Sequence, residues 1–119
     1  MREDVDKALG ASPVPVSDWL ALQRVIGDDL LVRLLCISKV SLRRYLSGAR
    51  RTPDDVAVRL HTLALIVDDL AGAYDDAGIR RWFARPRTTL GNRAPLDALT
   101  AGWQPDDPEV QQVRDLAPR

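Results

Sequence analysis

The chain has 119 residues, enough for one small domain or for two helical lobes that share a hydrophobic core. Its seventeen basic and seventeen acidic residues cancel, so the net charge gives no indication of a nucleic-acid partner. No uncharged stretch approaches the ~20 apolar residues that a membrane span needs, and the acidic N-terminus is unlike an export signal. We therefore expect a cytoplasmic protein with no membrane partner.

Strand signals are almost absent, whereas apolar residues recur three and four positions apart, so we predict an all-α fold. Residues 1–16, which contain a Pro-Val-Pro break, are expected to form a flexible N-terminal arm. Ser17 should cap the first helix, and Gly27 should end that helix in the left-handed conformation.

Two short helices with a tight turn between them are expected next. Adjacent aspartates precede a helix over residues 30–35, and residues 36–38 form the turn. Ser38 should cap a helix over residues 39–47 that stops at Gly48. This order is typical of a helix-turn-helix unit.

The longest helix is predicted over roughly residues 53–75, with Thr52 as its cap and Pro53 at its first position. Its apolar seam has helical spacing and consists of Val56, Leu60, Leu63, Val67, Leu70 and Tyr74. Three further apolar residues lie off that seam, so we expect this helix to pack against both lobes or against a second copy: Val58, Leu65 and Ile66. We assign residues 17–76 to the helix-turn-helix lobe, with this helix as its spine.

Residues 77–119 are expected to form a small helical C-terminal lobe. A short helix over residues 79–84 is followed by a proline-marked loop and by a helix from Pro95 to Gly102. Asp107 should cap the last helix, which has Pro108 at its first position.

The helix over residues 39–47 has one apolar side and one side rich in cations, which suits a helix that reads the major groove of DNA. Six basic residues and no acid lie between Arg33 and Arg51. The outward residues would read bases, and the flanking arginines would contact phosphates. The predicted DNA-binding residues are Arg33, Ser38, Lys39, Val40, Ser41, Arg43, Arg44, Ser47, Arg50 and Arg51. The alternative interpretation is a solvated helix face.

Other residues gave no reason to expect catalysis, a metal or a cofactor. His61 is the only histidine and Cys36 the only cysteine, which excludes an internal disulfide. We interpret Cys36 as a small buried hydrophobe, although it occupies the turn position where glycine is common. Three of the Asp-Asp pairs are interpreted as helix-start residues. The arginines over residues 80–93 should pair with Asp68, Asp69, Asp75 and Asp76.

Residues 82–99 read WFARPRTTLGNRAPLDAL, a Trp-x3-Pro-x3-Leu-Gly-x3-Pro-x3-Leu pattern. In this respect the chain resembles the Xre/MbcA/ParS antitoxin family, over roughly residues 17–117. The resemblance implies a dimeric, autorepressing DNA-binding antitoxin that neutralises a RES-like, NAD-consuming toxin. It implies a DNA role for Lys39, Ser41, Arg43 and Arg44. It also implies partner-binding residues, which we take as Trp82, Arg85, Pro86, Leu90, Gly91, Arg93, Pro95, Val113 and Leu116.

Two other non-enzymatic interpretations stay open. The chain could be a stand-alone transcriptional regulator whose C-terminal lobe serves oligomerisation. It could also be a protein-interaction adaptor whose helix-turn-helix has lost its DNA affinity, and Cys36 in the turn is the cue for this interpretation. An enzyme is the least favoured reading, because no nucleophile and base are brought together in the sequence.

Overall fold

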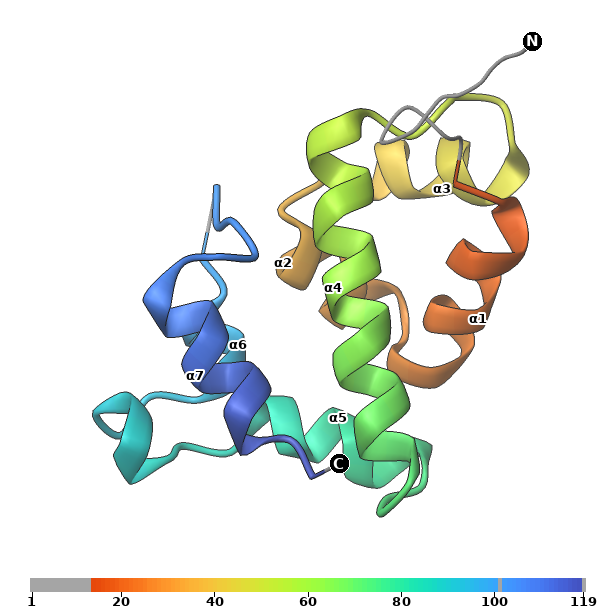
Figure 1. The fold of residues 1–119 in the computed structure, drawn as a ribbon. Coiled ribbons are helices and arrows are strands. Elements are labelled where there is room, and N and C mark those ends of the chain that lie inside the picture. The colour runs from red at the N-terminus through yellow and green to blue at the C-terminus, as the bar shows by residue number, and fades with distance from the viewer. Residues whose placement is uncertain (1–13, 101, 119) are drawn as a thin grey trace, which may run out of the picture.

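The structure is a computed structural model that describes residues 14–100 and 102–118. It is all-α, as predicted. Its elements in chain order are α1 (Val16–Ile26), α2 (Asp28–Leu35), α3 (Lys39–Ser47), α4 (Asp54–Ala71), α5 (Asp76–Ala84), the 3₁₀ turn η2 (Thr88–Leu90), α6 (Pro95–Ala98) and α7 (Pro108–Leu116) (Figure 1). Among the described residues no helix is both long and apolar enough to cross a bilayer.

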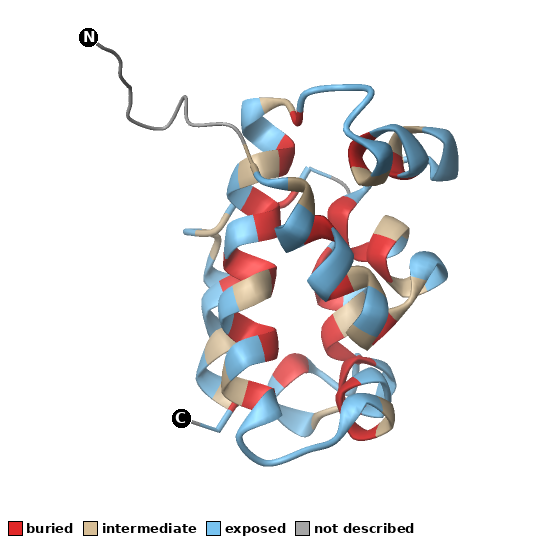
Figure 2. Ribbon diagram, turned by 90° about the vertical axis from the view of Figure 1, so that its right-hand side faces the viewer, coloured by how far each residue is buried: buried red, intermediate tan, exposed pale blue. Residues whose placement is uncertain are grey.

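Helix α4 runs through the middle of the molecule. Helix α3 lies near its N-terminal end, and α5 packs across its C-terminal end (Figure 1). One cluster of buried apolar residues includes members of every α-helix, among them Trp19, Leu42, Leu63, Phe83 and Val113. Buried residues lie on the inner faces of the helices and exposed residues on the outer faces (Figure 2). The helix-turn-helix segment and the C-terminal segment therefore share a continuous core.

The start of α1 differs from the prediction. The helix begins at Val16, and its N-cap is Pro15, so the Ser17 hydroxyl does not cap it. Residues 1–13 of the predicted arm lie outside the described residues. Gly27 has a positive φ of 82°, but its ψ of 164° places it outside the left-handed helical region. Since Gly27 reverses the chain in one residue, α2 follows directly at Asp28, two residues earlier than predicted.

The ends of α4 also correct the sequence prediction. Thr52 does not cap α4, because its Oγ1 accepts a hydrogen bond from the Trp19 indole at 2.8 Å, and Pro53 is the N-cap. The helix ends at Ala71, so Tyr74 lies beyond it and is 43% exposed instead of continuing the seam.

Of the three apolar residues predicted off the α4 seam, only Ile66 is buried. Val58 and Leu65 are exposed on the outer side of the helix. The second packing surface predicted for α4 is therefore limited, within the described residues, to the side that carries Ile66.

The C-terminal segment is compact but less helical than predicted. Helix α5 begins at Asp76, three residues early, because the Asp75 carboxylate accepts a hydrogen bond from the Gly78 N–H at 2.8 Å. Helix α6 ends at Ala98 and does not reach residue 102. Asp107 stands at the N-cap position of α7, yet its carboxylate accepts from the Gln104 N–H and not from the helix.

Candidate nucleic-acid interface

Helices α2 and α3 follow one another through a short turn that is held by local hydrogen bonds. The Ile37 N–H donates to the Val32 carbonyl at 3.1 Å and closes α2. The Ser38 Oγ accepts from the Ser41 N–H at 3.0 Å and caps α3, as predicted. Gly48 ends α3 in the left-handed conformation, also as predicted. Short-range signals in the sequence thus determine where α3 begins and ends.

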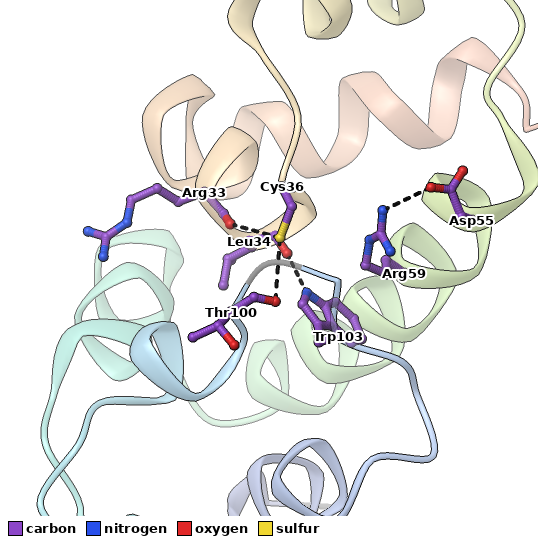
Figure 3. Close-up of polar contacts among 7 residues, drawn as sticks. All are labelled: Arg33, Leu34, Cys36, Asp55, Arg59, Thr100 and Trp103. Carbon is purple, nitrogen blue, oxygen red and sulfur yellow. Dashed lines mark hydrogen bonds and ion pairs between the residues drawn. The ribbon is translucent and has the colours of Figure 1, made fainter.

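Cys36 corrects one sequence interpretation. It is exposed and is not a buried hydrophobe. Its φ of 60° and ψ of 45° are those of a left-handed residue, the conformation that glycine adopts readily in such turns. Its sulfur lies 3.6 Å from the Thr100 carbonyl oxygen, next to the 2.7 Å hydrogen bond from the Trp103 indole to the Leu34 carbonyl (Figure 3). The C-terminal segment therefore braces the turn.

Helix α3 presents the predicted face to solvent. Leu42 and Tyr45 are buried in the core, so the opposite side of the helix faces outward. The exposed residues of the predicted set are Arg33, Ser38, Lys39, Val40, Arg43, Arg44, Ser47, Arg50 and Arg51, and Ser41 is half-buried. The predicted residues on α3 and in the loop after it are therefore accessible together, whereas Arg33 lies on α2 beside Asp97 of α6.

The region around α3 is less uniformly positive than its sequence indicates, because acidic residues from elsewhere in the chain contact two of its cations. The Lys39 Nζ lies 2.6 Å from the Asp29 Oδ1, and Arg33 lies 3.6 Å from Asp97. The hydrogen bond from Lys39, together with its charge, lowers the pKa of Asp29, and the same contact raises the pKa of Lys39. Lys39 and Arg33 thus have internal partners that would compete with phosphate.

Arg43 and Arg44 are the cations on α3 whose side chains stay free. Neither guanidinium group makes a hydrogen bond or an ion pair within residues 14–100 and 102–118. Together with Leu20 and Gln23 of α1, they line an open groove between α1 and α3. Because an arginine fork matches both guanine edges and phosphates, these two guanidinium groups can serve as base-reading or backbone-binding donors.

The loop after α3 is held in place by aromatic contacts that the sequence did not reveal. The Arg50 guanidinium lies 5.6 Å from the centre of the Tyr45 ring, and that ring stacks on Trp19 at 4.9 Å. Trp19 in turn donates its hydrogen bond to Thr52. This series of contacts fixes Arg50 beside the exposed face of α3, where a phosphate contact would add affinity without sequence information.

The predicted partner-binding residues divide into two groups. Four are buried in the core of this chain and cannot contact a partner in this conformation: Trp82, Leu90, Pro95 and Val113. Arg85, Pro86, Gly91 and Arg93 are exposed, and Leu116 is half-buried. Gly91 has the left-handed φ and ψ of 67° and 35° that its tight reversal requires. The motif therefore builds the C-terminal core, and its loops form the accessible surface.

Three of the arginines over residues 80–93 have partners other than the expected aspartates. Arg80 donates to the Val25 carbonyl at 2.7 Å, and Arg93 forms an ion pair with Glu109. Arg87 packs over the Trp82 ring at 5.2 Å. These contacts connect α5 to α1 and the loop after α5 to α7. The aspartates that we expected as partners lie before α5 or at its start. Sequence spacing could not find these contacts, because each joins separate elements.

No three His, Cys, Asp or Glu side chains of the described residues come together as ligands for a metal ion. His61 is exposed on α4. Comparisons with protein-family models, with curated proteins and with solved structures found no match for this chain. The antitoxin resemblance accordingly remains a prediction from the motif residues quoted above.

Proposed function

We propose that this protein binds duplex DNA by inserting the exposed face of α3 into the major groove, and that it acts as a transcriptional regulator in the cytoplasm. The observation that carries the proposal is the pair of guanidinium groups of Arg43 and Arg44, which have no partner among the described residues and lie on a helix whose opposite side is buried. Arg50, held by Tyr45, flanks that face. A helix presented this way, with phosphate-binding donors beside it, matches the geometry that a helix-turn-helix needs.

Fluorescence anisotropy with a labelled duplex from the region upstream of the coding sequence tests this proposal. Arg43→Ala and Arg44→Ala should each weaken binding about tenfold or more, because a bidentate base contact is lost. Arg81→Ala is the matched control, since it removes the same charge from an exposed position on α5. If all three variants bind the duplex as the wild type does, α3 is not the reading helix.

Arg50→Ala separates backbone contacts from base contacts. It should weaken binding to specific and random duplexes alike, and it should reduce the dependence of affinity on salt by about one counterion. A loss confined to the specific duplex would contradict the phosphate role of Arg50.

We further propose, on the resemblance of residues 82–99 alone, that the regulator is a dimeric antitoxin that binds a RES-like toxin. The accessible residues that support a partner surface are Arg85, Pro86, Gly91, Arg93 and Leu116. Co-expression with a RES-like protein encoded beside it should yield a stable complex and restore growth. If no complex forms while operator binding persists, the protein is a stand-alone regulator.

A further inference from the structure

A small pocket lined by three arginines lies at the junction of α4 and α5. Arg81 and Arg85 come from α5 and its C-cap, and Arg87 comes from the loop that follows. Tyr74, Gly78 and Trp82 complete the lining of this pocket, whose volume is about 130 Å³. No acidic residue lines it, so three positively charged side chains and no carboxylate of the described residues border this pocket.

Arg87 is fixed in place but leaves a donor unused. Its guanidinium packs over the Trp82 ring, and its Nη2 donates to the Trp82 carbonyl at 3.4 Å. Its Nε is buried and has no hydrogen-bond partner among the described residues. A buried N–H of a charged group without an acceptor is costly, but this atom has almost no accessible surface, so a ligand in the pocket would meet the other parts of the Arg87 side chain.

The other two arginines are open to an incoming ligand. Arg81 and Arg85 are exposed, and within residues 14–100 and 102–118 they have neither an ion pair nor a hydrogen bond from the side chain. The Asp75 carboxylate, which lies close to these arginines in the sequence, accepts a hydrogen bond from the N–H of Gly78. Mutual repulsion among three guanidinium groups falls when an anion binds between them.

We propose that this pocket binds a phosphoryl group, either as free phosphate or as the phosphate of a small monoester. Near neutral pH such a group carries about −1.5 to −2 charges and three acceptor oxygens, which suits several arginine forks better than one carboxylate does. The pocket volume is sufficient for a single tetrahedral oxyanion, and because the pocket is open to solvent, a group attached to the phosphate would extend out of it. The phosphate oxygens would accept hydrogen bonds from the guanidinium groups of Arg81, Arg85 and Arg87.

This pocket is separate from the DNA-binding face. Helix α4 has 18 residues and so is about 27 Å long. Helix α3 lies near the N-terminal end of α4, and α5 lies at its C-terminal end (Figure 1). The phosphate site therefore does not depend on the proposed DNA binding, and these two proposals can fail independently, whereas Arg85 also belongs to the partner surface proposed above.

An NMR titration of the full chain with inorganic phosphate, against chloride at equal ionic strength, tests the site. The indole N–H of Trp82 and the backbone N–H of Gly78 should shift saturably. Arg81→Gln combined with Arg85→Gln should weaken phosphate binding about tenfold or more, because charge-assisted hydrogen bonds are lost. Arg43→Gln combined with Arg44→Gln removes the same charge from α3 and should leave phosphate affinity unchanged. The first double variant should bind DNA as the wild type does.

Further arms identify the ligand chemistry. Phenyl phosphate should bind about as well as inorganic phosphate, whereas acetate should bind about tenfold more weakly or worse, since it offers one bidentate contact. Arg85→Lys retains the charge without the planar fork and should show an intermediate loss of phosphate affinity. This variant replaces the double glutamine variant if that variant fails to fold. Equal losses in both double variants, equal affinity for acetate, or no saturable shift at Trp82 would each overturn the proposal.

Discussion

The hydrogen bond between Trp19 and Thr52 should contribute measurably to the stability of the fold. This contribution can be distinguished from helix capping, the role that the sequence suggests for the same threonine. The Trp19 indole is 1% exposed, and its N–H has the Thr52 hydroxyl as its acceptor at 2.8 Å. Thr52→Val keeps the shape of the side chain and removes that acceptor. A buried donor left without a partner costs about 1–3 kcal/mol, so the free energy of unfolding should fall by that amount and the Tm by about 4–12 °C.

A double-mutant cycle distinguishes this bond from a capping role. Trp19→Phe also removes the donor, so the further change Thr52→Val should cost about 1 kcal/mol less in the Trp19→Phe background than in the wild type. If the Thr52 hydroxyl capped α4 instead, its loss would cost the same in both backgrounds.

Urea unfolding followed by circular dichroism measures these differences without depending on tryptophan emission. Thr89→Val is the matched control, since it makes the same chemical change at an exposed threonine of η2. If Thr52→Val unfolds at the same urea concentration as Thr89→Val, the indole hydrogen bond does not stabilise the fold, and the reasoning about the loop that carries Arg50 fails with it.

Two further predictions concern charge and backbone conformation. Asp29→Asn should raise affinity for duplex DNA about twofold to threefold, because Lys39 loses its internal partner and becomes free to bind a phosphate. The gain in affinity should be constant across neutral pH, because the pKa of Asp29 is lowered and its ion pair with Lys39 is lost only as the pH falls through that lowered value. Unchanged or weaker DNA binding of Asp29→Asn in fluorescence anisotropy would contradict this prediction. Gly91→Ala should reduce stability by about 1 kcal/mol, since φ at this position is +67° although no atom obstructs a Cβ. Gly72→Ala, at a φ of −71°, is the control and should unfold near the wild-type midpoint.

The segments that the sequence predicted best are those whose boundaries are set by neighbouring residues. Ser38 and Gly48 bound α3 in the structure as they did in the prediction, because a cap and a left-handed stop act within one turn of the chain. The division of α3 into a buried side with Tyr45 and an open side with Arg43 and Arg44 followed from helical periodicity alone.

The sequence prediction was wrong where a residue distant in the sequence binds a side chain to which the local sequence assigns another role. Thr52 has the sequence context of a cap, yet an indole 33 positions away takes its hydroxyl. Lys39 and Arg33 lie in a run without acids, yet Asp29 and Asp97 reach them across helix boundaries. Such contacts depend on how the helices cross, and a periodic pattern within one helix contains no information about that arrangement.

The proposal that α3 reads DNA is tested most directly by an NMR titration of the full chain with a short duplex at low salt. The proposal predicts that the largest shifts of backbone N–H groups fall on α3 and on the loop at Arg50, and that α5 changes little. Shifts confined to the segment from α5 to α7, or no shift at a salt concentration low enough for non-specific binding, would contradict the proposal.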